Sequence, residues 1–194
     1  MAGKIVVMVG LPGVGKTTVL NEVLKQAGER GIAVKNVNFG DVMFGIATSR
    51  GLAKNRDDMR KLRVETQASL QAEAAASISK MAAGTSVIID THAIIKTPQG
   101  YWPGLPAHIV NALHPNHIAV VEAEPTVIQQ RRAKDSDIRE RQDDLDLQEI
   151  ELSMLMNRAA SMASAVLCGA SVLFVRNEEG KAAEAASKIV PLLS

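Results

Sequence analysis

Aromatic residues are scarce in this sequence, which holds three Phe, one Trp and one Tyr among 194 residues. Hydrophobic residues nevertheless make up 46% of the chain, so the core must be built from Ala, Val, Ile, Leu and Met. Cysteine occurs once, at Cys168, and a single thiol excludes a framework of intrachain disulfides. This cysteine usage is typical of a reducing compartment such as the cytoplasm.

The sequence also lacks a surplus of charge and any long apolar run. Its 22 basic residues nearly balance 21 acidic ones, whereas a groove for nucleic acid normally needs a basic excess. The apolar run at residues 5–9 is far too short for the hydrophobic region of a signal peptide or for a membrane span. We therefore expect a cytoplasmic protein without nucleic-acid or membrane partners, folded as a single domain over residues 1–194.

The order of apolar and helical segments predicts the fold class. Short runs rich in β-branched residues are apolar nearly throughout, as strands buried on both faces are. The predicted strands are Lys4–Gly10, Ala33–Asn38, Ser86–Asp90, His117–Glu122 and Ser171–Arg176. The predicted helices between and after them are Thr17–Arg30, Asp41–Arg50, Glu65–Ala83, Pro125–Lys134, Asp144–Gly169 and Glu179–Leu193. This alternation predicts a three-layer α/β fold, with a parallel sheet covered by helices on both faces.

Two stretches depart from that alternation. Thr97–Pro106 is rich in Pro and Gly, and Lys134–Asp146 is crowded with charge. We expect both to be irregular. Long irregular segments in a compact domain are often functional or mobile, and ordinary surface loops are the alternative interpretation.

The strongest motif follows the first predicted strand. It has the pattern of Gly, four residues, Gly, Lys and then Thr, in which backbone N–H groups and the start of a helix form a cradle for phosphates. Lys16 is placed to reach the β- and γ-phosphates, and the Thr17 hydroxyl is placed to bind Mg²⁺. The predicted nucleotide-binding residues are Gly10, Leu11, Pro12, Gly13, Val14, Gly15, Lys16, Thr17 and Thr18.

Polar residues at the ends of two other strands support this site. Asp90 ends an apolar strand, where its carboxylate is placed to hold the Mg²⁺ shell beside the phosphate loop. Because ligands bind at the carboxyl ends of strands in open α/β sheets, we expect one rim to collect the loop and both strand ends. The candidate substrate-binding residues on that rim are Asn38, Gly40, Asp41, Asp90 and His92.

The phosphate loop predicts a triphosphate donor and leaves the acceptor open. A GTPase is expected to carry a guanine-reading Asn-Lys-x-Asp, which does not occur in the sequence. A kinase for an alcohol needs a base, for which Asp41 or Asp90 is available. A kinase for a nucleoside monophosphate needs cations instead, because two polyanions must be brought together. Arginines in three places favour the last reaction: Arg56, Arg60 and Arg63; Arg131 and Arg132; Arg139 and Arg141.

These motifs together resemble the archaeal type of adenylate kinase, from Lys4 to about Gly180. The resemblance is carried by the phosphate loop, Asn38–Asp41, Arg56–Leu62, Asp90–His92, Lys96–Tyr101, Gly104–Pro106 and Asn157-Arg158. It implies a single P-loop kinase domain that converts ATP and AMP reversibly to ADP with Mg²⁺. It further implies an AMP-binding helical segment near residues 38–65, a short lid near residues 132–146, and a homotrimer.

The resemblance also implies roles for single residues. Arg60 is expected to hold the AMP phosphate, and Arg131, Arg139 and Arg141 are expected to contact phosphates when the lid closes. Backbone between Asn177 and Gly180 is expected to line the adenine of ATP.

Other readings stay open beside this one. They are a kinase for a different acceptor and a nucleotide-binding module without activity. For Tyr101 and Trp102 we expect packing beneath the loop rich in Pro and Gly, with contact to a base as the alternative. The Ala-rich stretch Asn157–Ala165 suits a tight helix contact, within the domain or between subunits.

Overall fold

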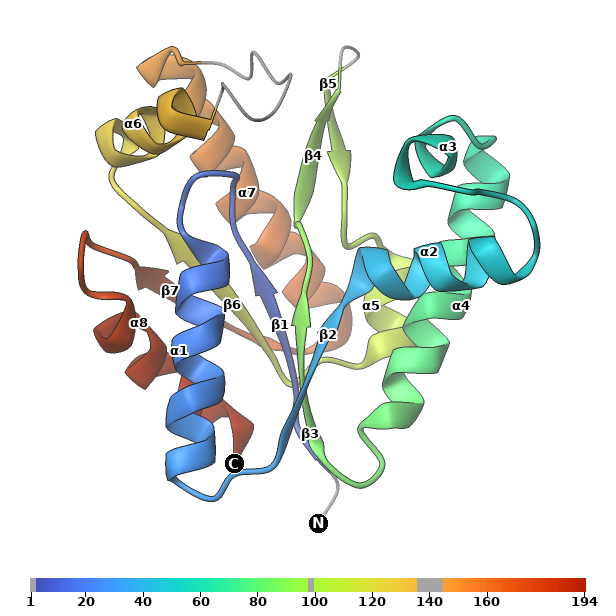
Figure 1. Ribbon diagram of the computed structural model, residues 1–194, viewed down its shortest axis with the longest axis horizontal. Helices are drawn as coiled ribbons and strands as arrows, with labels where there is room; N and C mark the ends of the chain where they lie inside the picture. Colours follow the sequence, from blue (N-terminus) through green and yellow to red (C-terminus); the bar gives the residue numbers. More distant parts are fainter. Residues whose placement is uncertain (1–2, 98–99, 136–144) are drawn as a thin grey trace.

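A five-stranded parallel sheet forms the centre of the protein (Figure 1). The computed structural model describes residues 3–97, 100–135 and 145–194, and it describes only the backbone of Asp57, Arg60 and Asp135. The strands are β1 (Ile5–Val9), β2 (Val34–Asn38), β3 (Ser86–Asp90), β6 (His117–Glu122) and β7 (Ser171–Arg176), in the spatial order β2-β3-β1-β6-β7. The predicted three-layer fold and all five predicted strands are confirmed.

Strand β1 pairs with β3 on one side and with β6 on the other, so later strands of the chain lie on both sides of β1. Met8 of β1 is paired with Asp90 of β3 and with Ala119 of β6. The carboxyl ends of β1, β2 and β3 therefore lie on one rim beside the topological switch point, which is where α/β sheets bind ligands.

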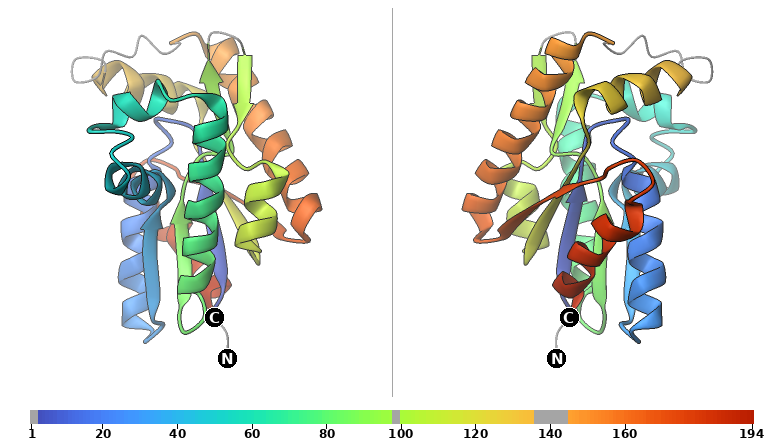
Figure 2. Two further views of the ribbon diagram at one scale, coloured as in Figure 1. Left: turned by 90° about the vertical axis from the view of Figure 1, so that its right-hand side faces the viewer. Right: turned by 90° about the vertical axis from the view of Figure 1, so that its left-hand side faces the viewer.

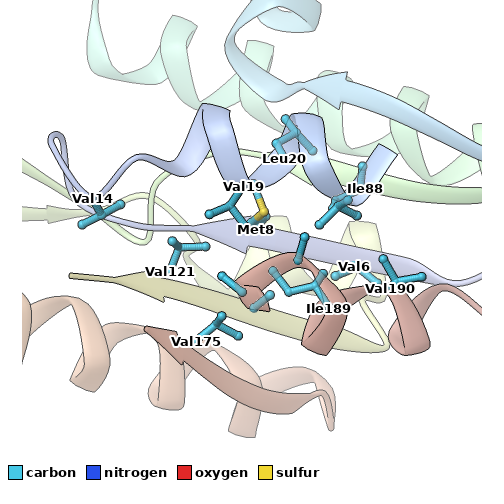
Figure 3. Packing of buried hydrophobic residues seen from close by; sticks show 14 of the residues in the cluster. Val6, Met8, Val14, Val19, Leu20, Ile88, Val121, Val175, Ile189 and Val190 are labelled. Carbon is cyan, nitrogen blue, oxygen red and sulfur yellow. The ribbon is translucent and has the colours of Figure 1, made fainter. Parts of the chain in front are cut away.

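Two cores cover the two faces of the sheet, because alternate side chains of a strand point to opposite sides. Val6 and Met8 pack with α1 (Lys16–Glu29), α8 (Ala182–Ile189) and the 3₁₀ turn Val190–Leu193. Figure 3 shows this first core around Met8, Val19 and Ile189. Ile5, Val7 and Val9 pack instead with α4 (Val64–Met81) and α5 (Ala107–Leu113). The side views of Figure 2 show α4 and the α1–α8 pair on opposite faces.

The remaining predicted helices are confirmed with small shifts of their ends. They are α2 (Phe39–Ser49), α6 (Pro125–Asp135) and α7 (Leu147–Cys168). The C-terminal helix is shorter than predicted, since α8 ends at Ile189 and Pro191 lies in the 3₁₀ turn. Proline has no N–H for the helical ladder, which explains the early end. Among the helices within the described ranges, none is both long and apolar enough to cross a membrane.

The prediction of an irregular segment at Thr97–Pro106 was wrong. Strands β4 (Ile94–Thr97) and β5 (Gly100–Pro103) form an antiparallel hairpin there. The β-branched and aromatic residues of these strands favour extended backbone, and this preference outweighs the Pro and Gly content. Two short helices, α3 (Arg56–Arg60) and α5 (Ala107–Leu113), were also not predicted. In the charged stretch Lys134–Asp146, residues 136–144 lie outside the described part of the chain.

Candidate functional site

The phosphate loop connects β1 to the first residue of α1. Two of its glycines leave no room for a side chain. A Cβ on Gly10 would lie 2.7 Å from the carbonyl oxygen of Val121. A Cβ on Gly15, which also has a φ of +80°, would lie 2.5 Å from Nδ2 of Asn177. Because Lys16 begins α1, unpaired N–H groups of the first helical turn face the same space as the loop.

Three successive carbonyls of the loop accept hydrogen bonds from side chains outside it. The pairs are Arg132 Nε to Pro12 O (3.0 Å), Arg131 Nη1 to Gly13 O (3.2 Å) and Asn177 Nδ2 to Val14 O (2.8 Å). The donors come from α6 and from the residue after β7. Side chains outside the loop thus hold these three carbonyls. Within the loop the N–H of Val14 donates to Leu11 O at 3.3 Å, and the remaining loop N–H groups are left for an anion.

Lys16 joins the loop to the end of β3. Its ammonium forms an ion pair with the carboxylate of Asp90, and Nζ lies 2.5 Å from the carbonyl oxygen of Thr91. Burial lowers the pKa of Lys16, against the opposing charge and hydrogen bond of Asp90. The other oxygen of Asp90 accepts a hydrogen bond from Nδ2 of Asn38, at 2.9 Å. The three predicted strand ends therefore meet, as the sequence indicated.

The oxygen groups beside Lys16 suit Mg²⁺. Thr17 is exposed in the first turn of α1, and the Asp90 carboxylate lies at the end of the neighbouring strand. Within the described ranges, no group of three or more His, Cys, Asp or Glu residues is placed to hold a metal. Mg²⁺ does not need such a cage, because it binds one or two protein oxygens together with phosphate oxygens and waters. The residues present therefore fit this ion.

A pocket extends from Lys16 and Asp90 along the rim. It is lined by Lys16, Asn38, Phe39, Gly40, Met43, Arg56, Gln71, Asp90, Thr91, His92, Ile95 and Gly104. Its walls come from α2, α3, α4 and the β4–β5 hairpin. The pocket thus contains four of the five candidate substrate-binding residues that were expected on the rim. The fifth, Asp41, forms an ion pair with the guanidinium of Arg56.

Asn38 shapes the wall formed by α2. Its Oδ1 caps this helix by accepting a hydrogen bond from the N–H of Asp41, at 3.1 Å. A Cβ on Gly40 would lie 3.3 Å from Asn38 Oδ1, a tight contact, and 3.5 Å from Arg56 Nη1, an ordinary one. His92 lies on the exposed side of the rim, where it was predicted.

Some predicted residues lie outside the described part of the chain or outside the described pocket lining. Arg139 and Arg141 lie outside the described residues, and Arg60 lies in α3 with its side chain outside the described part. Gly180 is exposed, with a φ of +73°. Asn177 is buried and uses its side chain to hold the phosphate loop, a role that the sequence did not reveal.

Seven lining residues were not among the predicted site residues: Phe39, Met43, Arg56, Gln71, Thr91, Ile95 and Gly104. Phe39, Met43 and Ile95 resemble ordinary core residues of helices and strands, so only the tertiary arrangement identifies them as lining residues. Arg56, also in the lining, belongs to the first arginine group but was not assigned a role.

A further ion pair lies on the same rim, at the end of β6. Glu122 ends β6, and its two carboxylate oxygens accept hydrogen bonds from Arg158 Nε and Nη2 of α7, at 2.5 and 2.7 Å. These bonds raise the pKa of Arg158 above its ordinary value. The ion pair places the Arg158 guanidinium of α7 at the end of β6, which lies beside β1 in the sheet.

Comparisons with known proteins agree with this geometry. A family described as an AAA domain matches residues 9–151. The chain is 43% identical to an adenylate kinase of Methanocaldococcus jannaschii, over 100% of both chains. It is 46% identical to an adenylate kinase of Saccharolobus solfataricus, over 96% of this chain and 97% of the relative. An adenylate kinase of Methanopyrus kandleri is 45% identical, over 97% of this chain and 96% of its own length.

Solved structures of other kinases share the fold. A shikimate kinase from Acinetobacter baumannii superposes with a TM-score of 0.62 at 15% identity, covering 97% of this chain and 92% of the other. An APS kinase from Mycobacterium tuberculosis superposes with a TM-score of 0.53 at 13% identity, covering 99% and 98%. At such identities the likeness concerns the fold, whereas the full-length relatives establish the family. The chain belongs to the archaeal adenylate kinase family.

Proposed function

We propose that this protein catalyses the reversible transfer of a phosphoryl group from ATP to AMP, which yields two ADP. The observation that carries the proposal is the pocket that starts at Lys16 and Asp90 and continues between α2, α3, α4 and the hairpin. In this proposal the pocket is the acceptor site, directly beside the phosphate loop. The full-length relatives named adenylate kinase support AMP as the acceptor.

The donor half of the site consists of residues 10–18. In this proposal the loop N–H groups hold the phosphates of ATP, and Lys16 neutralises charge on the β- and γ-phosphates. Thr17 and Asp90 would hold Mg²⁺, which would supply positive charge to offset that of the phosphates. The backbone from Asn177 to Gly180 lines the adenine.

The acceptor half lies between α2 and the hairpin. Asn38, Gly40, Asp90 and His92 line this half, and Asp41 holds Arg56 at its edge. We assign the AMP phosphate to this arginine-rich side, with Arg60 as a further cation. The AMP-binding segment then comprises residues 38–65 of a single kinase domain, and the lid comprises residues 132–146.

The arrangement of charges favours a phosphate acceptor over an alcohol. An alcohol must lose its proton to a base, but the carboxylates of Asp41 and Asp90 are each already paired with a cation. A phosphate oxygen of AMP is ionised near neutral pH and needs no such base. It attacks the γ-phosphorus of ATP, the bond to the bridging oxygen breaks, and ADP leaves. Cations stabilise the charge during transfer, and Arg131, Arg139 and Arg141 are the proposed lid contributions.

Formation of ADP from ATP and AMP in the presence of Mg²⁺ is the direct test. The full-length protein should produce ADP at a rate well above its hydrolysis of ATP alone. A panel with CMP, UMP and GMP distinguishes AMP from other acceptors. Preference for another monophosphate would replace AMP in the proposal, and tight ATP binding without any transfer would reduce the protein to a nucleotide-binding module.

The assembly and location are also part of the proposal: a homotrimer in the cytoplasm. An exposed stripe on α7 supports an assembly of subunits. Its residues repeat at spacings of three and four, as in helices that pack on one another: Leu152, Leu155, Ala159, Met162 and Val166. Leu155 is 56% exposed and Val166 78% exposed, although both are apolar. Such a stripe is typical of a contact between subunits.

A further inference from the structure

The β4–β5 hairpin has two faces with different surroundings. Lys96 and Tyr101 are cross-strand partners, and both reach α7. Lys96 Nζ lies 3.1 Å from Glu149 Oε2, and Tyr101 Oη lies 2.8 Å from Ser153 Oγ. This face therefore fastens the hairpin to α7. Figure 1 shows the hairpin standing between α7 and the segment that contains α2 and α3.

The opposite face carries the neighbouring cross-strand pair, Ile95 and Trp102. Successive side chains of a strand point to opposite sides, so these two point away from the face that holds α7. Ile95 lines the acceptor pocket. Side chains directly opposite one another in antiparallel strands have Cβ atoms about 5 Å apart, which places Trp102 beside Ile95 at the edge of that pocket.

The pocket has a charged part and an apolar part. Lys16, Asp90 and Arg56 form the charged part, whereas Phe39, Met43 and Ile95 provide apolar surface. A nucleoside monophosphate has the same division, since its phosphate is charged and its base is flat and mostly apolar. Trp102 is 43% exposed beside the apolar part, so an indole ring is available there for contact with a base. The sequence predicts that Trp102 packs beneath the loop rich in Pro and Gly, whereas its side chain is exposed in the structure.

We propose that Ile95 and Trp102 form the platform for the base of the acceptor nucleotide, and that stacking on Trp102 makes the site prefer purine monophosphates. This inference rests on the proposed function, because it assigns the base end of the same acceptor pocket. Stacking of a base on an aromatic side chain depends on overlap of the two ring systems, so a two-ring purine gains more than a pyrimidine.

The chain holds a single tryptophan, so the indole fluorescence of the whole protein reports on position 102 alone. Titration with AMP should change this emission with saturation, and CMP should require a higher concentration for the same change. Emission that stays constant at AMP concentrations that saturate turnover contradicts the platform.

Substitutions separate binding of the base from catalysis. Trp102→Leu should raise the KM for AMP about five- to a hundredfold, the range measured for loss of a stacked base. The KM for ATP and the kcat at saturating AMP should change little, while Trp102→Phe should recover most of the AMP affinity. Ile95→Ala provides a second variant that weakens the same platform and leaves the indole in place.

Phe174→Leu is the matched control. Phe174 is 42% exposed, close to the value for Trp102, and it lies on β7 outside the pocket lining. The control should leave the KM for AMP unchanged.

The two proposals can fail separately. If the wild type makes ADP but Trp102→Leu keeps the same KM for AMP and the same preference for AMP over CMP, the platform is wrong and the kinase activity stands. If the wild type makes no ADP, the proposed function is wrong. A saturable change of fluorescence with AMP would then still support a purine site at Trp102, and no change would overturn it.

Discussion

The ammonium of Lys16, in the phosphate-loop motif and at the start of α1, is paired with the carboxylate of Asp90 at the end of strand β3. Lys16 also donates a hydrogen bond to the carbonyl of Thr91, one residue further along. The cation of the donor site is thus held by the strand that also borders the acceptor pocket. A triphosphate in the loop must share Lys16 with Asp90, and this relationship leads to the first two predictions.

Replacement of Lys16 by Ala should abolish turnover and leave the fold intact. Loss of one charge-stabilising donor at a reacting group typically costs about a hundredfold or more in rate. Asp90 keeps its hydrogen bond from Asn38 in this variant, so circular dichroism should be unchanged. Lys25→Ala is the control, because Lys25 is an exposed lysine of the same helix, 3.9 Å from Glu22. Near-normal turnover of Lys16→Ala would remove this residue from the mechanism.

As the pH rises, binding of ATP should weaken at a lower pH than it would if Lys16 had the pKa of an ordinary lysine. Burial lowers the pKa of Lys16 below 10.5 in the folded protein. Between the lowered pKa of Lys16 in the folded protein and its ordinary pKa in the unfolded chain, the unfolded chain binds more protons. The contribution of Lys16 to stability therefore rises with pH across this window. A bound triphosphate favours the charged ammonium, so binding should take up a proton in the same window.

Calorimetric titration with a non-hydrolysable ATP analogue, in buffers of different ionisation enthalpy, measures this proton uptake. Lys16→Arg is the control, because a guanidinium stays charged throughout the range. Equal proton uptake by the wild type and by Lys16→Arg would assign the protonation to another group.

Asn177→Ala should impair the ATP side of the reaction more than the AMP side. Asn177 Nδ2 donates to the carbonyl of Val14, and its loss leaves a buried acceptor without this partner. Such a loss costs about 1–3 kcal/mol, so we expect the KM for ATP to rise about five- to a hundredfold. The KM for AMP should stay within about twofold of the wild-type value, a change of less than about 0.5 kcal/mol. Steady-state kinetics with each substrate varied in turn measures both.

Gln26→Ala is the matched control for that variant. The amide of Gln26 also donates to a backbone carbonyl, that of Ala183, at 2.8 Å, but on the exposed surface between α1 and α8. This control should leave both KM values unchanged. A similar rise in the KM for ATP in both variants would show that general destabilisation, rather than the position of the phosphate loop, causes the effect.

Arg56→Ala should raise the KM for AMP and leave the KM for ATP unchanged. Arg56 lines the pocket, and its ion pair with Asp41 holds the guanidinium at the pocket edge, where an incoming phosphate can compete with Asp41 for it. A hydrogen bond between charged groups contributes about 1.5–3 kcal/mol, which corresponds to an increase of about ten- to a hundredfold.

Arg50→Ala tests whether loss of another arginine ion pair close to α2 has the same effect, since Arg50 is the C-cap residue of that helix. Arg50 forms a two-bond pair with Glu73, at 2.7 and 2.5 Å, outside the pocket lining. Exposed pairs of this kind contribute about 0–1 kcal/mol to stability. An unchanged KM for AMP in Arg56→Ala would remove Arg56 from the acceptor site.

Leu155→Glu should dissociate the proposed trimer into monomers, because it places a charge in the centre of the exposed stripe on α7. Sedimentation velocity measures the change in mass. Val64→Glu is the control, since Val64 is 58% exposed and Leu155 is 56% exposed, but Val64 lies on α4. If Leu155→Glu sediments like the wild type, the stripe on α7 is not the subunit contact.

Residues that are close together in the sequence determined much of the outcome. The five strands were predicted because continuous apolar runs suit a parallel sheet, and the phosphate loop was predicted because its conformation depends on a few neighbouring residues. Asp90 and Asn38 were predicted to meet because parallel strands end on the same rim. The hairpin was missed because Pro and Gly were weighed above the strand preference of Ile94, Ile95, Tyr101 and Trp102.

Only the tertiary structure decided which distant residues complete the site. Asn177 reaches Val14 across 163 positions of sequence, and its role follows from packing that no local pattern encodes. The pocket unites Met43, Gln71 and Ile95 from three different elements. The two faces of the hairpin became distinguishable only when one of them was found against α7. The sequence by itself thus determined the strands and the donor loop, whereas the folded chain determined the acceptor pocket, because residues far apart in the sequence meet only through packing.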